Sequence, residues 1–177
     1  MSVLNFDKLE NAYITTYENA KELIEEAEIL YESKKYARAY FLAQIAYEEI
    51  AKLPIIFQEA SRAYFKETHD WKVFYMRLRN HLSKNKMNLA SETFYGFSKA
   101  KLSDIENRIE MMNRLKNGSL YSDLDGKQFI KPSDVFKKEG ANSRIQATVF
   151  LEFYTDANYH VKGNMKKWLN TDKGKKG

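Results

Sequence analysis

Apolar side chains recur every three or four residues along most of this chain, which is the spacing of one buried helix face. The 177 residues include only seven glycines and two prolines, Pro54 and Pro132, so long segments can stay helical without interruption. The pattern predicts an all-α bundle that forms a single domain over residues 1–170. The basic stretch 171–177 lacks apolar positions, and we expect it to be a disordered tail.

The stripes also predict where the helices begin and end. We expect a first helix over residues 7–34 and a second from Tyr36 to a kink or end at Pro54, with helix continuing after Pro54 to Phe65. Three more helices are expected, from Asp70 to about Phe97, one that ends at Lys116, and one over Asn142–Leu169. The segment that begins at Tyr36 carries two apolar stripes, which predicts a central helix.

One segment departs from the helical rhythm. Gly118 is predicted to stop the helix before it, and residues 119–132 are predicted to form a short irregular or hairpin insertion. The dipeptide Asp125-Gly126 is the turn signal inside that insertion. Ser133 could cap a short helix that follows.

The composition excludes several kinds of site. There are no cysteines, so neither a disulfide nor a thiolate metal centre can form. HExxH, paired ExxH, phosphate-loop and GxSxG motifs are missing, and we expect no metal and no cofactor. No run of about 18 apolar residues and no signal-peptide pattern occurs, so we expect a cytoplasmic protein without a membrane span. The net charge of +5 permits an acidic partner.

The segment Tyr75–Lys84, YMRLRNHLSK, holds four basic side chains and no carboxylate. On one continuous helix, Arg77, His81 and Lys84 would lie on one strip beside the apolar face. Arginine keeps its charge, and histidine moves a proton near neutral pH. RNA cleavage needs a base, an acid and a cation near the phosphorus. We therefore interpret His81 and Arg77 as candidate catalytic residues and Lys84 as an RNA contact; the alternative is a solvated basic strip with a partly buried histidine.

Two further groups of charged residues are candidates. Glu48 and Lys52 are one helical turn apart on an apolar stripe, and they could be a buried ion pair that fixes helix register or part of a site. Arg114 and Lys116 close a predicted helix, where basic residues suit the helix dipole and could also contact RNA.

Arg62 and His69, with six residues between them, form a second candidate pair of arginine and histidine.

Three segments occur in a recognisable order along the chain. They are YARAYFLAQIAYEEIAK at 36–52, the spaced set Trp71, Phe74, His81 and Lys84, and RLKNGSLYSDLDGKQFIKP at 114–132. Together they resemble the AbiV family of bacterial abortive-infection proteins, which is grouped with the HEPN superfamily of α-helical domains. The resemblance runs from about Leu9 to Phe136, and EEIAK and SLYSDLDG are its most specific pieces.

This resemblance implies a HEPN-like helical bundle that pairs into a homodimer and an antiphage protein that halts infected cells. Many members of the superfamily are metal-independent ribonucleases with Arg, four to six residues, then His, and two copies face each other to form one site. Arg77 and His81 have three residues between them, one too few, whereas Arg62 and His69 fit but straddle the predicted break before Asp70. His81 matches the AbiV pattern better. Glu48, Lys52 and Arg114 also match family positions.

Three functions follow as hypotheses. The first is an abortive-infection effector that acts on RNA, as a metal-independent endoribonuclease, and blocks translation. The alternative is a non-enzymatic helical module that sequesters a phage or ribosomal protein. A third is a scaffold that binds nucleic acid without cutting it, and the placement of most Tyr and Phe residues on core stripes weighs against it.

Overall fold

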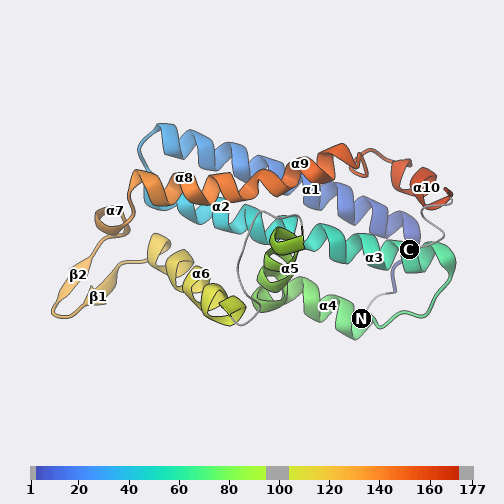
Figure 1. The fold of residues 1–177 in the computed structure, drawn as a ribbon, viewed down its shortest axis with the longest axis horizontal. Helices are drawn as coiled ribbons and strands as arrows, with labels where there is room; N and C mark the ends of the chain where they lie inside the picture. The colour runs from blue at the N-terminus through green and yellow to red at the C-terminus, as the bar shows by residue number, and fades with distance from the viewer. Residues whose placement is uncertain (1–2, 95–103, 172–177) are drawn as a thin grey trace.

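The computed structural model describes residues 3–94 and 104–171, and helices make up most of them (Figure 1). The helices are α1 (Phe6–Glu32), α2 (Tyr36–Ile50), α3 (Lys52–Phe65), α4 (Trp71–Arg79), α5 (His81–Phe94), α6 (Ile105–Leu120), α7 (Pro132–Val135), α8 (Lys138–Gln146), α9 (Phe150–Asp156) and α10 (Asn164–Leu169), with a 3-10 turn at Ala147–Val149. The all-α prediction is confirmed. Within the described ranges, no helix is both long and apolar enough to cross a bilayer.

Helix α2 lies at the centre of the bundle. It contacts α1 and α8 on one side and α5 and α6 on the other. Figure 1 shows α1, α8 and α9 running along the long axis beside α2 and α3, while α4, α5 and α6 lie on the opposite side. Buried residues occur along the whole of α2, from Ala37 to Ile50, which agrees with the prediction of a central helix.

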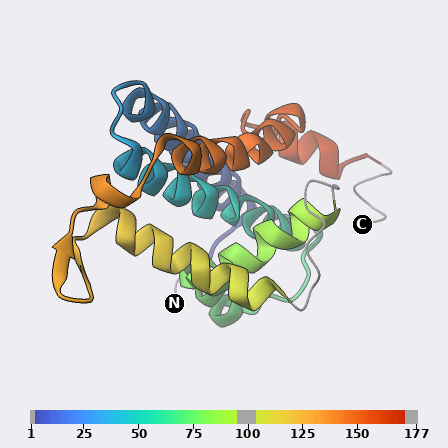
Figure 2. The same ribbon diagram turned by 60° about the vertical axis from the view of Figure 1, so that its left-hand side comes forward.

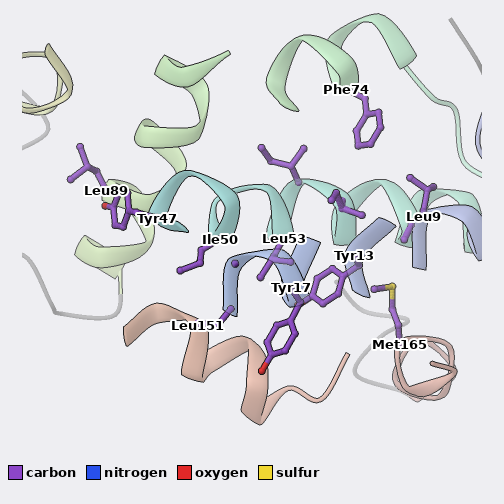
Figure 3. Close-up of a cluster of buried hydrophobic side chains, with 14 of the residues drawn as sticks. Leu9, Tyr13, Tyr17, Tyr47, Ile50, Leu53, Phe74, Leu89, Leu151 and Met165 are labelled. Atoms are coloured by element: carbon purple, nitrogen blue, oxygen red, sulfur yellow. The ribbon is translucent and has the colours of Figure 1, made fainter. Parts of the chain in front are cut away.

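Side chains from nearly every long helix meet in one hydrophobic core (Figure 3). The members labelled there are Leu9, Tyr13 and Tyr17 from α1, Tyr47 and Ile50 from α2, Leu53, Phe74, Leu89, Leu151 and Met165. Burying each of the Leu, Ile, Phe and Met side chains among them stabilises the fold by about 1.5–3 kcal/mol. A core of this size holds α2 and α3 in place, and with them the polar residues at their ends.

The break between α2 and α3 agrees with the prediction made from Pro54. Helix α2 ends at Ile50, and α3 begins at Lys52. Pro54 has no amide hydrogen to donate to the carbonyl of Ile50, four residues earlier, so the regular hydrogen-bond ladder is interrupted there.

The single helix predicted from Asp70 to Phe97 is wrong, because the chain breaks between α4 and α5 at Asn80. Its backbone is extended, with φ −83° and ψ 114°. The side-chain Oδ1 of Asn80 accepts a hydrogen bond from the amide of Ser83 at 3.2 Å, which is the geometry of a cap at a helix start. Asp70 caps α4 in the same way through Val73. Residues 95–97 of the predicted helix lie outside the described residues.

Three other predicted helix ends need correction. Gly118 does not stop α6, which continues to Leu120. Helix α7 begins at Pro132, so Ser133 lies inside it and does not cap it. The helix predicted over Asn142–Leu169 is divided into α8, the 3-10 turn, α9 and α10.

Left-handed backbone separates α9 from α10. Asn158 has φ 57° and Gly163 has φ 86°, a conformation that no regular helix contains. The buried carboxylate of Glu10 accepts a hydrogen bond from the amide of Gly163 at 3.0 Å, which ties this bend to α1. The apolar spacing of the segment continues through the bend, so the spacing alone predicted a longer helix.

The predicted insertion near residues 119–132 contains a β-hairpin. Strands β1 (Asp123–Asp125) and β2 (Gln128–Ile130) pair antiparallel, and Gly126 supplies a left-handed φ of 62° in the turn. Leu124 and Phe129 pair across the strands, and both side chains are exposed. Residues 172–177 of the predicted tail lie outside the described residues.

Candidate functional site

A buried carboxylate with three basic partners forms the most unusual polar group of the described chain. The Glu48 side chain, in the last turn of α2, is only 2% exposed. Its Oε1 lies 2.8 Å from Nζ of Lys116, and its Oε2 lies 3.2 Å from Nζ of Lys84. Oε2 is also hydrogen-bonded to Nδ1 of His81. We call Glu48, His81, Lys84 and Lys116 the Glu48 cluster.

Three helices supply these side chains. His81 and Lys84 come from the first turn of α5, and Lys116 comes from near the end of α6. Figure 2 shows α5 (light green) and α6 (yellow) beside each other against α2 (teal), and each contacts α2. Near the cluster, the Asn88 side chain donates a hydrogen bond to the carbonyl of Tyr47, which fixes α5 against α2.

The cluster keeps Glu48 ionised. Burial by itself would raise the pKa of the Glu48 carboxyl, but hydrogen bonds from Lys116 and His81 and the charges of Lys116 and Lys84 outweigh burial and hold that pKa below its ordinary value. Two lysine charges face one carboxylate, so the cluster carries excess positive charge even with a neutral imidazole. Such a potential favours an anion at the neighbouring surface.

His81 is the member of the cluster that solvent reaches. Its side chain is 55% exposed, whereas those of Lys84 and Lys116 are 7% and 11% exposed. Because an ionised carboxylate can only accept hydrogen bonds, Nδ1 of His81 carries the proton that points at Glu48. The neutral ring then has its lone pair on Nε2. This is the arrangement of a histidine that a carboxylate orients for proton transfer.

The predicted Glu48–Lys52 ion pair is wrong. Lys52 pairs with Glu49, and Glu49 also accepts a hydrogen bond from the Asn19 amide at 3.1 Å. The helix break at Ala51 separates Lys52 from the turn that holds Glu48. Glu48 instead faces α5 and α6, where the donors of the cluster satisfy it.

The predicted strip of Arg77, His81 and Lys84 does not lie on one helix. Arg77 belongs to α4, and its Nη1 donates to Oε1 of Gln58 at 2.9 Å. Arg114 is exposed on α6 and contributes to a surface hollow with Asn107, Glu110 and Met111. The structure therefore brings His81, Lys84 and Lys116 together, while Arg77 is engaged with α3.

Arg62 and His69 meet at a second buried carboxylate, Glu59. Nδ1 of His69 lies 2.5 Å from Oε1 of Glu59, and Nη1 of Arg62 lies 3.4 Å from Oε2. The His69 ring also stacks on Trp71, with ring centroids 4.7 Å apart. At 19% exposed, the His69 side chain is much less accessible than that of His81.

Sequence reasoning missed Glu59 and the role of Lys116 as a partner of Glu48. A signal for Lys116 was present, since it continues the buried positions Ile105, Ile109 and Met112 of α6. A lysine at a buried position implies a buried acidic partner, but the spacing does not say which one. Within the described ranges, no group of three or more His, Asp or Glu side chains is arranged to hold a metal ion.

The family model HEPN_AbiV, described as AbiV, matches residues 8–152 of the chain. The match covers every member of the Glu48 cluster and the β-hairpin. No curated protein matches the sequence. No solved structure matches it either.

Proposed function

The chain belongs to the AbiV family of HEPN abortive-infection proteins, and from this premise we propose that it acts on RNA as a metal-independent ribonuclease that blocks translation in infected cells. The observation that carries the proposal is the exposed His81 imidazole, which the buried Glu48 carboxylate orients. An imidazole held in this way is suited to proton transfer.

The proposed reaction begins at Nε2 of His81. Nε2 takes the proton of a ribose 2′-hydroxyl, and the 2′-oxygen attacks the adjacent phosphorus. The bond from phosphorus to the 5′-oxygen breaks, and that oxygen takes a proton from an acid, leaving a 2′,3′-cyclic phosphate and a 5′-hydroxyl. Glu48 stabilises the imidazolium that forms. We assign the acid to His81 of a second copy of the chain.

The basic residues divide into two roles under this proposal. Lys84 and Lys116 are almost buried and bound to Glu48, which favours a role in holding the carboxylate ionised over direct contact with RNA. Their excess charge also attracts the phosphate toward His81. Arg114 is exposed, and we assign it to contact with the RNA backbone.

A homodimer would place two imidazoles at one site. The surface around His81 supports it, because Leu82 follows His81 directly and is an exposed apolar side chain. Val73 and Met76 on α4 are exposed as well. Covering such side chains with a second copy removes apolar surface from water.

The test substitutes His81→Ala. The variant is expected to keep its fold, since the side chain is more than half exposed, and to lose both RNA cleavage and protection against phage. The assay incubates the purified protein with total RNA in the presence of a chelator and identifies 2′,3′-cyclic ends. Lys86→Ala is the matched control, because Lys86 is an exposed basic residue on the same helix. Cleavage by the His81→Ala variant equal to that of the unchanged protein would refute the catalytic assignment.

The second candidate function is a binding module that sequesters a phage or ribosomal protein. The exposed cross-strand pair Leu124 and Phe129 favours it, because apolar side chains at a hairpin surface suit a protein partner. Intact RNA together with a stable protein complex would support this function. The assay is repeated with extract of infected cells, because an enzyme that needs a phage trigger would also leave RNA intact.

A further inference from the structure

We propose that the groove between α1 and the α8–α9 segment is a docking site for a basic amphipathic helix of another protein. The groove has a volume of about 420 Å³. Figure 1 shows α1, α8 and α9 on the side of the bundle opposite α4, α5 and α6. None of the candidate site residues lines this groove, and the inference does not depend on the proposed ribonuclease activity.

The groove follows one face of α1 for about three turns. The lining residues on α1 are Tyr17, Lys21, Ile24 and Glu28, whose spacing of four, three and four places them on one side of the helix. Tyr17 and Glu28 are about 16 Å apart along the helix axis. The opposite wall is α8, the 3-10 turn Ala147–Val149 and α9. A 3-10 turn changes the rotation per residue, so the side chains of α8 and α9 do not continue as one row against α1.

The floor of the groove is apolar. Ile24 is half-buried, and Ile145 and Leu151 are buried. The hydroxyls of Tyr17 and Thr155 share a hydrogen bond at 2.6 Å, so these polar groups already have a partner. Figure 3 shows Tyr17 directed toward the helix that carries Leu151. A ligand on this floor therefore gains free energy mainly by removing apolar surface from water.

The rims of the groove are acidic. Helix α1 carries eight acidic and two basic side chains, although the whole chain has a net charge of +5. Glu18, Glu22 and Glu25 are exposed and lie one row outward from the lining residues of α1. On the other rim, Glu152 and Asp156 are exposed, and the sequence of α9 contains no basic residue. Carboxylates along both rims favour a cationic partner.

Two carboxylates of the lining are available to such a partner. The side chains of Glu28 and Glu152 form no ion pair within residues 3–94 and 104–171. Lys21 pairs with Glu25 at 3.7 Å, but both side chains are more than half exposed. A pair exposed to that degree is weak, so it does not cancel the negative charge of the rim.

The shape of the groove favours a helix as the occupant. Its walls are helices, whose backbone amides and carbonyls are paired within each helix, so an extended peptide would find few backbone partners there. A helical occupant pairs its own backbone and can lay an apolar face in the groove. Lysine or arginine side chains on the flanks of that face would meet the acidic rims. The same rims would repel a nucleic-acid backbone.

The experiment measures the fluorescence anisotropy of a labelled peptide titrated with the full chain. The peptide has about 18 residues, because shorter helices are marginal in water. It carries leucines at three-to-four spacing on one face and lysines on both flanks. One comparison peptide has glutamates in place of the lysines, and the other has the same composition in an order that gives no apolar face. We expect saturable binding of the first peptide alone, weakened by added salt.

Substitutions in the protein test the location. We expect Glu28→Lys to weaken binding of the basic peptide about tenfold, because repulsion replaces attraction. Glu26→Lys is the matched control: it makes the same charge change on the same helix, but residues two apart point to nearly opposite sides. Val149→Asn removes an exposed apolar side chain from the groove and should weaken binding about fivefold. Val135→Asn on α7 is its control.

Three outcomes would overturn the inference. The first is no binding of the basic peptide, or equal binding of either comparison peptide. The second is equal weakening by Glu28→Lys and Glu26→Lys, which would mean that net charge is responsible. The third is self-association of the full chain that Glu28→Lys abolishes, which would assign the groove to a second copy.

Failure of this inference can be distinguished from failure of the proposed function. The His81→Ala variant is expected to bind the basic peptide as the unchanged protein does, whatever its effect on RNA. The substituted side chains at the groove and in the controls are exposed, so each variant is expected to remain folded. Circular dichroism of each variant checks this.

Discussion

Substituting Glu48→Gln should destabilise the fold far more than a typical change of one charge. Glutamine keeps the shape of the side chain but removes the negative charge, and it leaves Lys84 and Lys116 almost buried without a carboxylate. Removing one partner from a buried ion pair costs about 3–5 kcal/mol. The glutamine oxygen can still accept one hydrogen bond, so we expect a loss near the lower figure, about 3 kcal/mol.

The loss can be measured by urea unfolding followed by circular dichroism. For a chain of this size it corresponds to a fall in the melting temperature on the order of 10 °C. Glu49→Gln is the matched control, because Glu49 is the next residue of the same helix and its pair with Lys52 is partly exposed. A partly exposed pair contributes about 1 kcal/mol or less, so the control should change stability only slightly.

A double-mutant cycle tests whether the cluster itself is responsible. Lys116→Met should also destabilise the protein, because it removes the 2.8 Å contact with Glu48. The loss of stability in the combined variant should be smaller than the sum of the two single losses by at least about 1 kcal/mol. The reasoning would be refuted if the two losses were additive, or if Glu48→Gln cost no more than Glu49→Gln.

Two further predictions follow from the same contacts. The pKa of Glu48 is lowered in the folded state, so its stabilising effect is fully present above the ordinary value of 4.5 and is lost as pH falls through the folded pKa. Urea unfolding on acidification should therefore show a larger loss of stability for the unchanged protein than for Glu48→Gln, and equal losses would contradict this assignment. His69→Ala should cost about 1–2 kcal/mol, because it removes a hydrogen bond to buried Glu59, yet leave RNA cleavage intact. Lost cleavage in a folded His69→Ala protein would move the catalytic assignment from His81 to this residue.

The local signals of the sequence were sufficient for most of the secondary structure. The three-to-four spacing predicted the helices because that spacing is a property of each helix by itself. The Asp125-Gly126 turn predicted an irregular or hairpin insertion, and the structure has the hairpin; Pro54 predicted a kink or end of α2, and the structure has a break there. Both signals act on the backbone within a few residues. These features do not depend on which helices later pack together.

The helix boundaries that were wrong share a cause. At Asn80 and at Asn158 the apolar spacing continues through the break, so periodicity alone could not reveal it. The break at Asn80 depends on its side chain capping α5 through Ser83. The bend before α10 is held by Glu10, more than 150 residues earlier in the chain. A contact between residues so far apart in the sequence cannot be predicted from the local pattern.

The sequence by itself therefore determined the helical class, the place of the non-helical insertion and the presence of charged residues on an apolar stripe. Only the tertiary structure decided that Glu48 pairs with His81 and Lys116, 33 and 68 residues away, and not with Lys52. The physical reason is that a buried carboxylate must find compensating donors wherever the packing of helices brings them. The arrangement of α5 and α6 against α2 makes that choice, and no short segment of the chain contains it.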